Sequence, residues 1–174
     1  VGTCVLLSPL YHPIRLAEDI AVVDQATEGR MVAAMGIGYQ PDDFDAFGVS
    51  IKERAARTEE SVEILKTAWK GERFSYPSRF HKIENVRVTP SSFQKNGPPI
   101  WLAGWVPAGL KRAARMGDGW IADPIQSLEV IRDYANQYRA EAKKQNRKPF
   151  VVLMRDCIIG CLLYTSDAAD EWIG

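Results

Sequence analysis

The sequence predicts an α/β fold with a parallel sheet, because short apolar runs alternate with segments of helical periodicity along the chain. The clearest case lies within residues 98–122. Ile100–Ala103 is an apolar run between prolines and Gly104, Pro107 opens a segment of helical spacing, and Trp120–Ala122 is a second apolar run. Short apolar runs bounded by proline or glycine indicate buried strands. Parallel α/β sheets form either an open doubly wound sheet or a closed barrel.

The same patterns assign the other elements in order. Apolar, β-branched runs predict strands over residues 1–7, 31–35, 100–103, 120–122 and 150–154. Apolar side chains at helical spacing predict helices over residues 14–26, 52–69, 107–116 and 127–146. We expect loops at residues 8–13 and at the acidic, aromatic segment 42–49, and an excursion with a small hairpin at residues 71–95.

The helix after Pro107 is expected to be amphipathic. Its small and apolar side chains should face the sheet, and its basic side chains should face solvent. The inward set is Ala108, Leu110, Ala113 and Ala114, and the outward set is Lys111, Arg112 and Arg115.

Composition limits the classes of function. The 174 residues are 46% hydrophobic and 25% charged with a formal net charge of zero, which suits one soluble domain and predicts no nucleic-acid or membrane partner. No apolar span is long enough for a membrane helix. The three cysteines have no metal-binding spacing, so we expect no metal and a cytoplasmic location.

The turn at Gly104, Trp105 and Val106 is the first candidate site. It joins a predicted strand to a predicted helix, so its backbone N–H groups lie at a helix N-terminus, where the helix dipole favours an anion. A phosphate-bearing ligand is one interpretation. The alternative is an ordinary strand–helix turn.

Further candidates also follow predicted strands. Gly36-Ile-Gly38 begins like a dinucleotide-binding fingerprint, but Pro41 stands where the third glycine belongs. We interpret these glycines as a close approach of the backbone to a ligand or a neighbour. His12, Tyr39 and Asp123 come after strands as well, where the active site of a barrel would lie.

Several segments together carry a resemblance to a known family. The chain resembles the luciferase-like flavin-dependent oxidoreductases, which include bacterial luciferase, alkanesulfonate monooxygenases and coenzyme F420-dependent reductases and dehydrogenases. The matching segments keep the family's order and rough spacing; they are residues 1–5, 12–19, 23–25, 28–30, 35–38, 44–48, 99–104 and 113–120.

The resemblance implies an incomplete (β/α)₈ TIM barrel of about five of the eight parallel strands. Residue 1 would begin the third strand and residues 150–154 would form the seventh. Residues 1–160 would then be a partial flavin-binding barrel domain. Residues 161–174 resemble a translated sequencing adapter and are expected to be a non-native tail, the alternative being an ordinary polar tail.

The resemblance also implies a site for FMN or coenzyme F420. Its phosphate would bind the backbone N–H groups of Gly104, Trp105 and Val106, where many relatives have a serine in place of Val106. Trp105 would cover the ligand or simply pack. The Cys4–Val5 peptide would be cis and support the flavin ring, the alternative being a trans strand with Cys4 as a buried thiol.

The remaining candidates carry two interpretations each. Gly36 would lie against the cofactor. Asp123 would orient substrate or contact the flavin ring, or it would be a helix N-cap. His12 would act as an acid, base or flavin-facing group, or it would bond to backbone at a helix entry. Tyr39 would line the substrate pocket, and no catalytic residue is assigned.

The activity implied is oxidation of an organic substrate with reduced FMN and oxygen, or hydride transfer with F420. The alternatives are a non-catalytic flavin-binding relative and a phosphate-binding barrel enzyme without flavin. Bacterial luciferase has a reactive cysteine and an arginine at the positions of Gly36 and Ile37, so light emission is not expected. A small organic substrate and a homo-oligomer of the full-length protein are expected, and the 174 residues alone should show no turnover.

Overall fold

A computed structural model describes residues 1–155 of the chain, so the predicted tail at residues 161–174 lies outside the described residues. A five-stranded sheet forms its centre, and each neighbouring pair of strands is parallel. The strands, in their order across the sheet, are β1 (Leu6–Leu7), β2 (Ala33–Gly36), β5 (Ile100–Ala103), β6 (Gly119–Ala122) and β7 (Val151–Leu153). The predicted α/β class with a parallel sheet is therefore confirmed.

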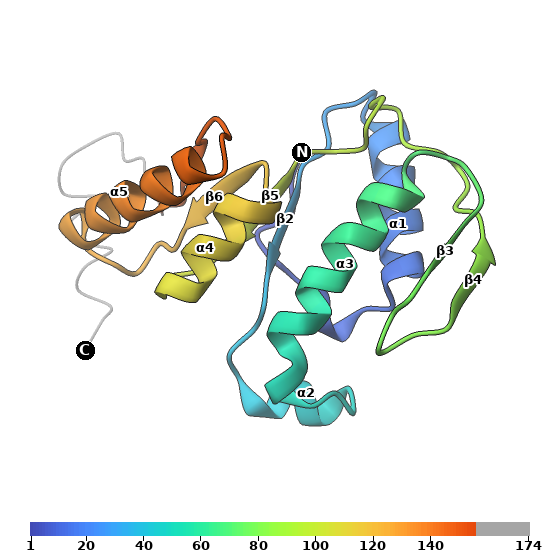
Figure 1. Cartoon of the computed structure of the whole chain (residues 1–174), viewed down its shortest axis with the longest axis horizontal. Helices are drawn as coiled ribbons and strands as arrows, with labels where there is room; N and C mark the ends of the chain where they lie inside the picture. The colour runs from blue at the N-terminus through green and yellow to red at the C-terminus, as the bar shows by residue number, and fades with distance from the viewer. Residues whose placement is uncertain (156–174) are drawn as a thin grey trace, which may run out of the picture.

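Four long helices cover the sheet. They are α1 (Pro13–Ala26), α3 (Arg54–Ala68), α4 (Pro107–Met116) and α5 (Leu128–Lys144). Figure 1 shows α1 beside α3 at one end of the sheet and α4 beside α5 at the other. Pro13 and Pro107 each begin a helix, where a missing N–H costs nothing. Ser127 caps α5 by accepting a hydrogen bond from the Val130 N–H at 3.3 Å.

The core lies between the helices and the sheet. Large side chains from both layers are almost fully buried, including Leu16, Leu65, Ile100, Leu110 and Trp120. Burying side chains of this size contributes roughly 1.5–3 kcal/mol each, and this fixes the strand ends relative to the helix ends. None of the helices formed by residues 1–155 has the length and apolar character needed to cross a bilayer.

Three local predictions differ from the structure in extent or in local structure. Of the strand expected over residues 1–7, only Leu6–Leu7 is paired as a strand, with one isolated bridge from Gly2 to Val32. The loop expected over residues 42–49 contains a short helix, α2 (Pro41–Ala46), whose Pro41 and two first-turn aspartates suit a helix N-terminus. The helix expected from residue 52 begins with a 3₁₀ turn at Ile51–Glu53 before α3.

The predicted hairpin is present. Strands β3 (Phe74–Tyr76) and β4 (Ile83–Val86) pair in antiparallel fashion and form a sheet separate from the main one. Figure 1 shows the hairpin beyond α3, away from the central sheet. Its loop is tied to α3, because Glu60 accepts hydrogen bonds from Ser78 at 2.6 Å and from the Arg79 side chain at 3.0 Å.

The face of α4 toward the core differs from the prediction at two positions. Arg112 is buried, with a side-chain exposure of 9%, whereas Ala108 is exposed. The other inward residues, Leu110, Ala113 and Ala114, are buried as predicted. Arg112 tolerates burial because its Nε donates to Glu59 of α3 at 3.0 Å, so the buried charge has an ionic partner.

Candidate functional site

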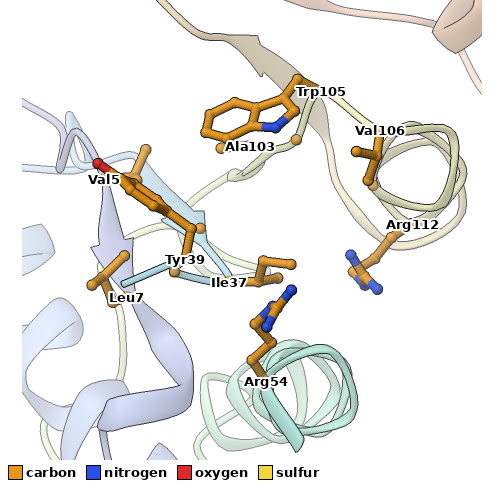
Figure 2. Close-up of a pocket in the computed structure, with 13 residues that line it drawn as sticks. Val5, Leu7, Ile37, Tyr39, Arg54, Ala103, Trp105, Val106 and Arg112 are labelled. Carbon is orange, nitrogen blue, oxygen red and sulfur yellow. The ribbon is translucent and has the colours of Figure 1, made fainter. Parts of the chain in front are cut away.

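A cavity of about 220 Å³ opens at the carboxyl ends of β1, β2 and β5. Figure 2 shows side chains from these strand ends and from the helices α3 and α4 around one space. Its walls are mainly apolar and are formed by Val5, Leu7, Gly36, Ile37, Gly38, Tyr39, Arg54, Ala103, Gly104, Trp105, Val106, Gly109 and Arg112. The structure thus brings together six of the residues predicted from the sequence, namely Val5, Gly36, Tyr39, Gly104, Trp105 and Val106.

The backbone N–H groups at the β5–α4 turn are free to bind an external acceptor. Within residues 1–155, no protein oxygen accepts a hydrogen bond from the N–H of Gly104, Trp105 or Val106. The carbonyl groups here are occupied: Trp120 Nε1 donates to Gly104 O at 2.7 Å, and the Gly109 N–H donates to Val106 O at 2.8 Å. These free donors are what the predicted anion site requires, and their contact with a ligand stays a prediction.

Two close contacts made by glycines set the shape of this cavity. A Cβ on Gly104 would lie 3.0 Å from the Cα of Gly109, so the strand end and the first turn of α4 touch backbone to backbone. A Cβ on Gly36 would lie 3.0 Å from Cγ2 of Val5. The close approach predicted at Gly36 is therefore present, and the neighbour that requires it is Val5.

Two arginines of the cavity were not predicted from the sequence. Arg54 is in the first turn of α3, and within residues 1–155 its one side-chain hydrogen bond is from Nη1 to Ile51 O, at 3.3 Å. Arg112 follows Gly109 by three residues on the same face of α4, and neither of its Nη atoms donates to an acceptor within residues 1–155. Figure 2 shows the two guanidinium groups pointing toward one another beside Ile37. They add two positive charges to a space already bordered by free N–H groups.

A second cavity of about 390 Å³ adjoins the first at the ends of β5 and β6. It shares Val5, Tyr39, Ala103 and Trp105 with the first cavity and adds Ile121, Ala122, Asp123, Pro124, Ile125, Gln126 and Met154. The rings of Tyr39 and Trp105 lie 6.1 Å apart between centroids, where the two cavities meet. Together the cavities offer a cationic compartment and an apolar compartment joined at an aromatic pair.

Comparison with known protein families shows which family the chain belongs to. A family model described as luciferase-like monooxygenase matches residues 1–173. The chain belongs to the luciferase-like monooxygenase family. A protein of Sinorhizobium fredii with no assigned function, y4vJ, is 33% identical over 175 residues, which are 98% of this chain and 48% of that protein. The F420-dependent hydroxymycolic acid dehydrogenase of Mycobacterium tuberculosis is 28% identical over 172 residues, which are 93% of this chain and 45% of the dehydrogenase.

Solved structures similar to this chain have the same fold. Monooxygenase RslO1 from Streptomyces bottropensis superposes with a TM-score of 0.88 and 28% identity, over 98% of this chain and 53% of RslO1. The oxygenating constituent of 3,6-diketocamphane monooxygenase from Pseudomonas putida, solved with FMN, shares the fold with a TM-score of 0.75 and 19% identity. The match covers 87% of this chain and 46% of that one. The chain spans about half the length of the relatives that it matches. The predicted incomplete barrel is confirmed, and the family uses FMN or F420 as predicted.

The strand-end peptide that the resemblance singled out is cis in this luciferase-like chain. The Cys4–Val5 bond is cis, as the resemblance implied. The alternative of a buried thiol in a trans strand is wrong, because Cys4 is exposed and its Sγ lies 2.8 Å from Sδ of Met154. Val5 lines both cavities, whereas Cys4 lines neither.

His12 and Asp123 were each given two interpretations. His12 is the N-cap of α1, where its Nδ1 accepts from the Ile14 N–H at 3.3 Å, so the helix-entry interpretation is confirmed. Its ring packs against His81 at 4.5 Å, and it lines neither cavity. Asp123 lines the second cavity and accepts from the Ile125 N–H at 2.6 Å. Since Ser127 caps α5, the N-cap interpretation of Asp123 is wrong.

Acid should weaken the support of Arg112 through Glu59. Burial raises the pKa of Glu59, but hydrogen bonds from Arg115 and Arg112 outweigh it, so its pKa lies below the ordinary value of 4.5. A lowered pKa means that the pair stabilises the fold above about pH 4.5 and that this stability is lost as pH falls through the folded-state pKa. We expect Glu59→Gln to lower the melting temperature more at pH 7 than at pH 3, and Glu72→Gln, an exposed control, to leave it unchanged at both. An equal loss at both pH values would contradict the ionic role of Glu59.

Proposed function

We propose that this chain is the cofactor-binding part of a flavin-dependent oxidoreductase that acts on a small organic molecule. The observation that carries the proposal is the first cavity, where free N–H groups and two arginines of the described residues converge. Such a set suits a phosphate, because guanidinium groups and backbone N–H groups at a helix N-terminus both favour an anion. The residues present therefore fit the phosphate end of FMN or F420.

The rest of the cofactor would extend from this anion compartment. The second cavity has apolar walls and meets the first at Tyr39 and Trp105, so a planar ring system would lie at this junction and leave the rest of the second cavity to the substrate. When bound, the cofactor would supply the redox chemistry, either oxygen-dependent oxidation or hydride transfer. This chain's own residues would bind its phosphate, orient its ring and exclude water with apolar walls.

The test is cofactor binding by the full-length protein that contains this chain. Purified protein, freed of bound chromophore, would be titrated with FMN and with F420, and binding followed by absorbance and fluorescence quenching. We expect saturable binding of one of them, with reduction of the bound form by a suitable donor and reoxidation by oxygen or by an organic acceptor. Failure to bind either cofactor would contradict the proposal and favour a barrel enzyme that binds phosphate without flavin.

A further inference from the structure

The two cavities differ in charge. Arg54 and Arg112 line the first cavity, whereas none of the described residues that line the second is an arginine, lysine or histidine. The carboxylate of Asp123 is the one acidic group among them. An anion entering the second cavity would therefore meet apolar walls and a carboxylate, without a compensating cation.

Arg155 is bound to the backbone of the loop that lines the second cavity. Arg155 follows β7, and its Nη1 donates to the carbonyl oxygens of Asp123 and Pro124. Its Nη2 donates to Gln126 O at 2.6 Å. These bonds fix the loop between β6 and α5 and engage three of the four terminal N–H groups of Arg155. Arg155 therefore holds the wall in place, and its side chain does not line the cavity.

The loop that Arg155 holds presents an apolar rim. Ile125 lines the second cavity and is 84% exposed, which leaves a large apolar side chain uncovered at its mouth. An apolar ligand bound in the cavity would remove part of the Ile125 side chain and its own surface from water together, so Ile125 offers apolar contact to such a ligand.

We propose that the second cavity admits an uncharged, largely apolar organic substrate and rejects anionic substrates such as sulfonates and carboxylates. The inference rests on the proposed function, because it names the substrate class of the same site. Ile125 and Asp123 are the specificity-determining residues: Ile125 offers apolar contact, and the Asp123 carboxylate repels a second negative charge.

The experiment compares two probes of equal chain length, 1-octanol and octane-1-sulfonate. Calorimetric titration of the full-length protein would give their dissociation constants. Saturating cofactor, or inorganic phosphate where no cofactor binds, would be present so that the anion compartment of the first cavity is already filled. We expect octanol to bind at least about tenfold more tightly than the sulfonate. Sulfonate binding as tight as octanol binding, or no binding of either probe, would overturn the inference.

Charge variants locate the selectivity. Ile125→Lys adds a cation at the mouth of the cavity and should improve sulfonate binding about tenfold or more. Asp123→Asn removes the negative charge but keeps an acceptor for the Ile125 N–H, and it should improve sulfonate binding by a smaller factor. The matched control is Leu128→Lys, which changes a 61% exposed residue three positions along that does not line the cavity. An equal gain from the control would show nonspecific attraction and overturn the inference.

The outcomes separate the two proposals. Cofactor titrations and probe titrations are independent, so a protein that prefers octanol but binds neither FMN nor F420 would remove the flavin function and leave the selectivity of the cavity intact. A protein that binds cofactor but prefers the sulfonate would support the flavin function and overturn the proposed selectivity of the cavity.

Discussion

Replacing Arg54 by glutamine is expected to weaken binding of the phosphorylated cofactor about 10- to 100-fold. Hydrogen bonds to a charged group contribute roughly 1.5–3 kcal/mol each, and tenfold in affinity corresponds to about 1.4 kcal/mol. Arg54 is suited to such a bond, because it lines the first cavity and the one acceptor of its side chain in the described part of the chain is Ile51 O, at 3.3 Å. The measurement is fluorescence quenching with FMN and with riboflavin, or with F420 and its phosphate-free deazaflavin.

The phosphate-free analogue isolates the effect. If Arg54 contacts phosphate, the variant should lose affinity for the phosphorylated cofactor and bind the analogue as the wild type does. Arg57→Gln is the matched control, since Arg57 lies one turn further along α3, pairs with Glu53 at 2.9 Å and does not line the cavity. A loss of equal size for both ligands, or an equal loss from Arg57→Gln, would contradict a phosphate contact.

Arg112 allows a second, independent comparison between a variant and its control. Arg112→Gln should also lower affinity for the phosphorylated cofactor, whereas Arg115→Gln removes the other partner of Glu59 without touching the cavity. Because Arg112 is buried, Arg112→Lys accompanies it and should retain part of the affinity if charge is what matters. Thermal melting of each variant would show whether a loss of binding reflects a loss of folding.

Gly104→Ala is expected to damage both the fold and the site. Its Cβ would lie 3.0 Å from the Cα of Gly109, and backbone cannot move aside as the end of a side chain can. Overpacking of this kind costs about 1–3 kcal/mol, and here it would push the β5–α4 turn away from α4. The free N–H groups of that turn would move with it, so we expect cofactor affinity to fall by about tenfold or more in addition.

Chemical denaturation and cofactor titration would measure the two effects separately. Gly109→Ala should behave like Gly104→Ala, because its Cβ would lie 3.1 Å from the Cα of Gly104. Gly2→Ala is the control, as its nearest contact would be an ordinary 3.5 Å and it is exposed, so its effect should stay within about 0.5 kcal/mol. Unchanged stability and affinity in both turn variants would show that this close contact does not shape the site.

The strand–helix alternation was predictable from the sequence, because burial imposes a period on each element. Ile100–Ala103 and the helix after Pro107 have the bounds that their apolar pattern and proline indicate. The helix at Pro41–Ala46 was missed because its one buried anchor, Phe44, is too little to show a periodicity. Short elements depend on tertiary contacts that a local pattern does not contain.

The site was predictable where it depends on backbone and not where it depends on pairing between distant residues. Free N–H groups at Gly104–Val106 follow from a strand, a turn and a proline. The inward position of Arg112 depends on Glu59 of another helix, so its basic character alone favoured the wrong face. The three-residue spacing of Gly109 and Arg112, which places them on one helix face, was the signal in the sequence for the inward position of Arg112. It is informative only once Gly109 is known to face the turn.

The most direct test is the response of the backbone amides themselves. In a ¹H–¹⁵N NMR titration of the full-length protein, we expect the amide signals of Trp105 and Val106 to shift strongly with the phosphorylated cofactor and much less with its phosphate-free analogue. Amide signals at this turn that stay unmoved, while the cofactor binds tightly elsewhere, would contradict an anion site at the β5–α4 turn.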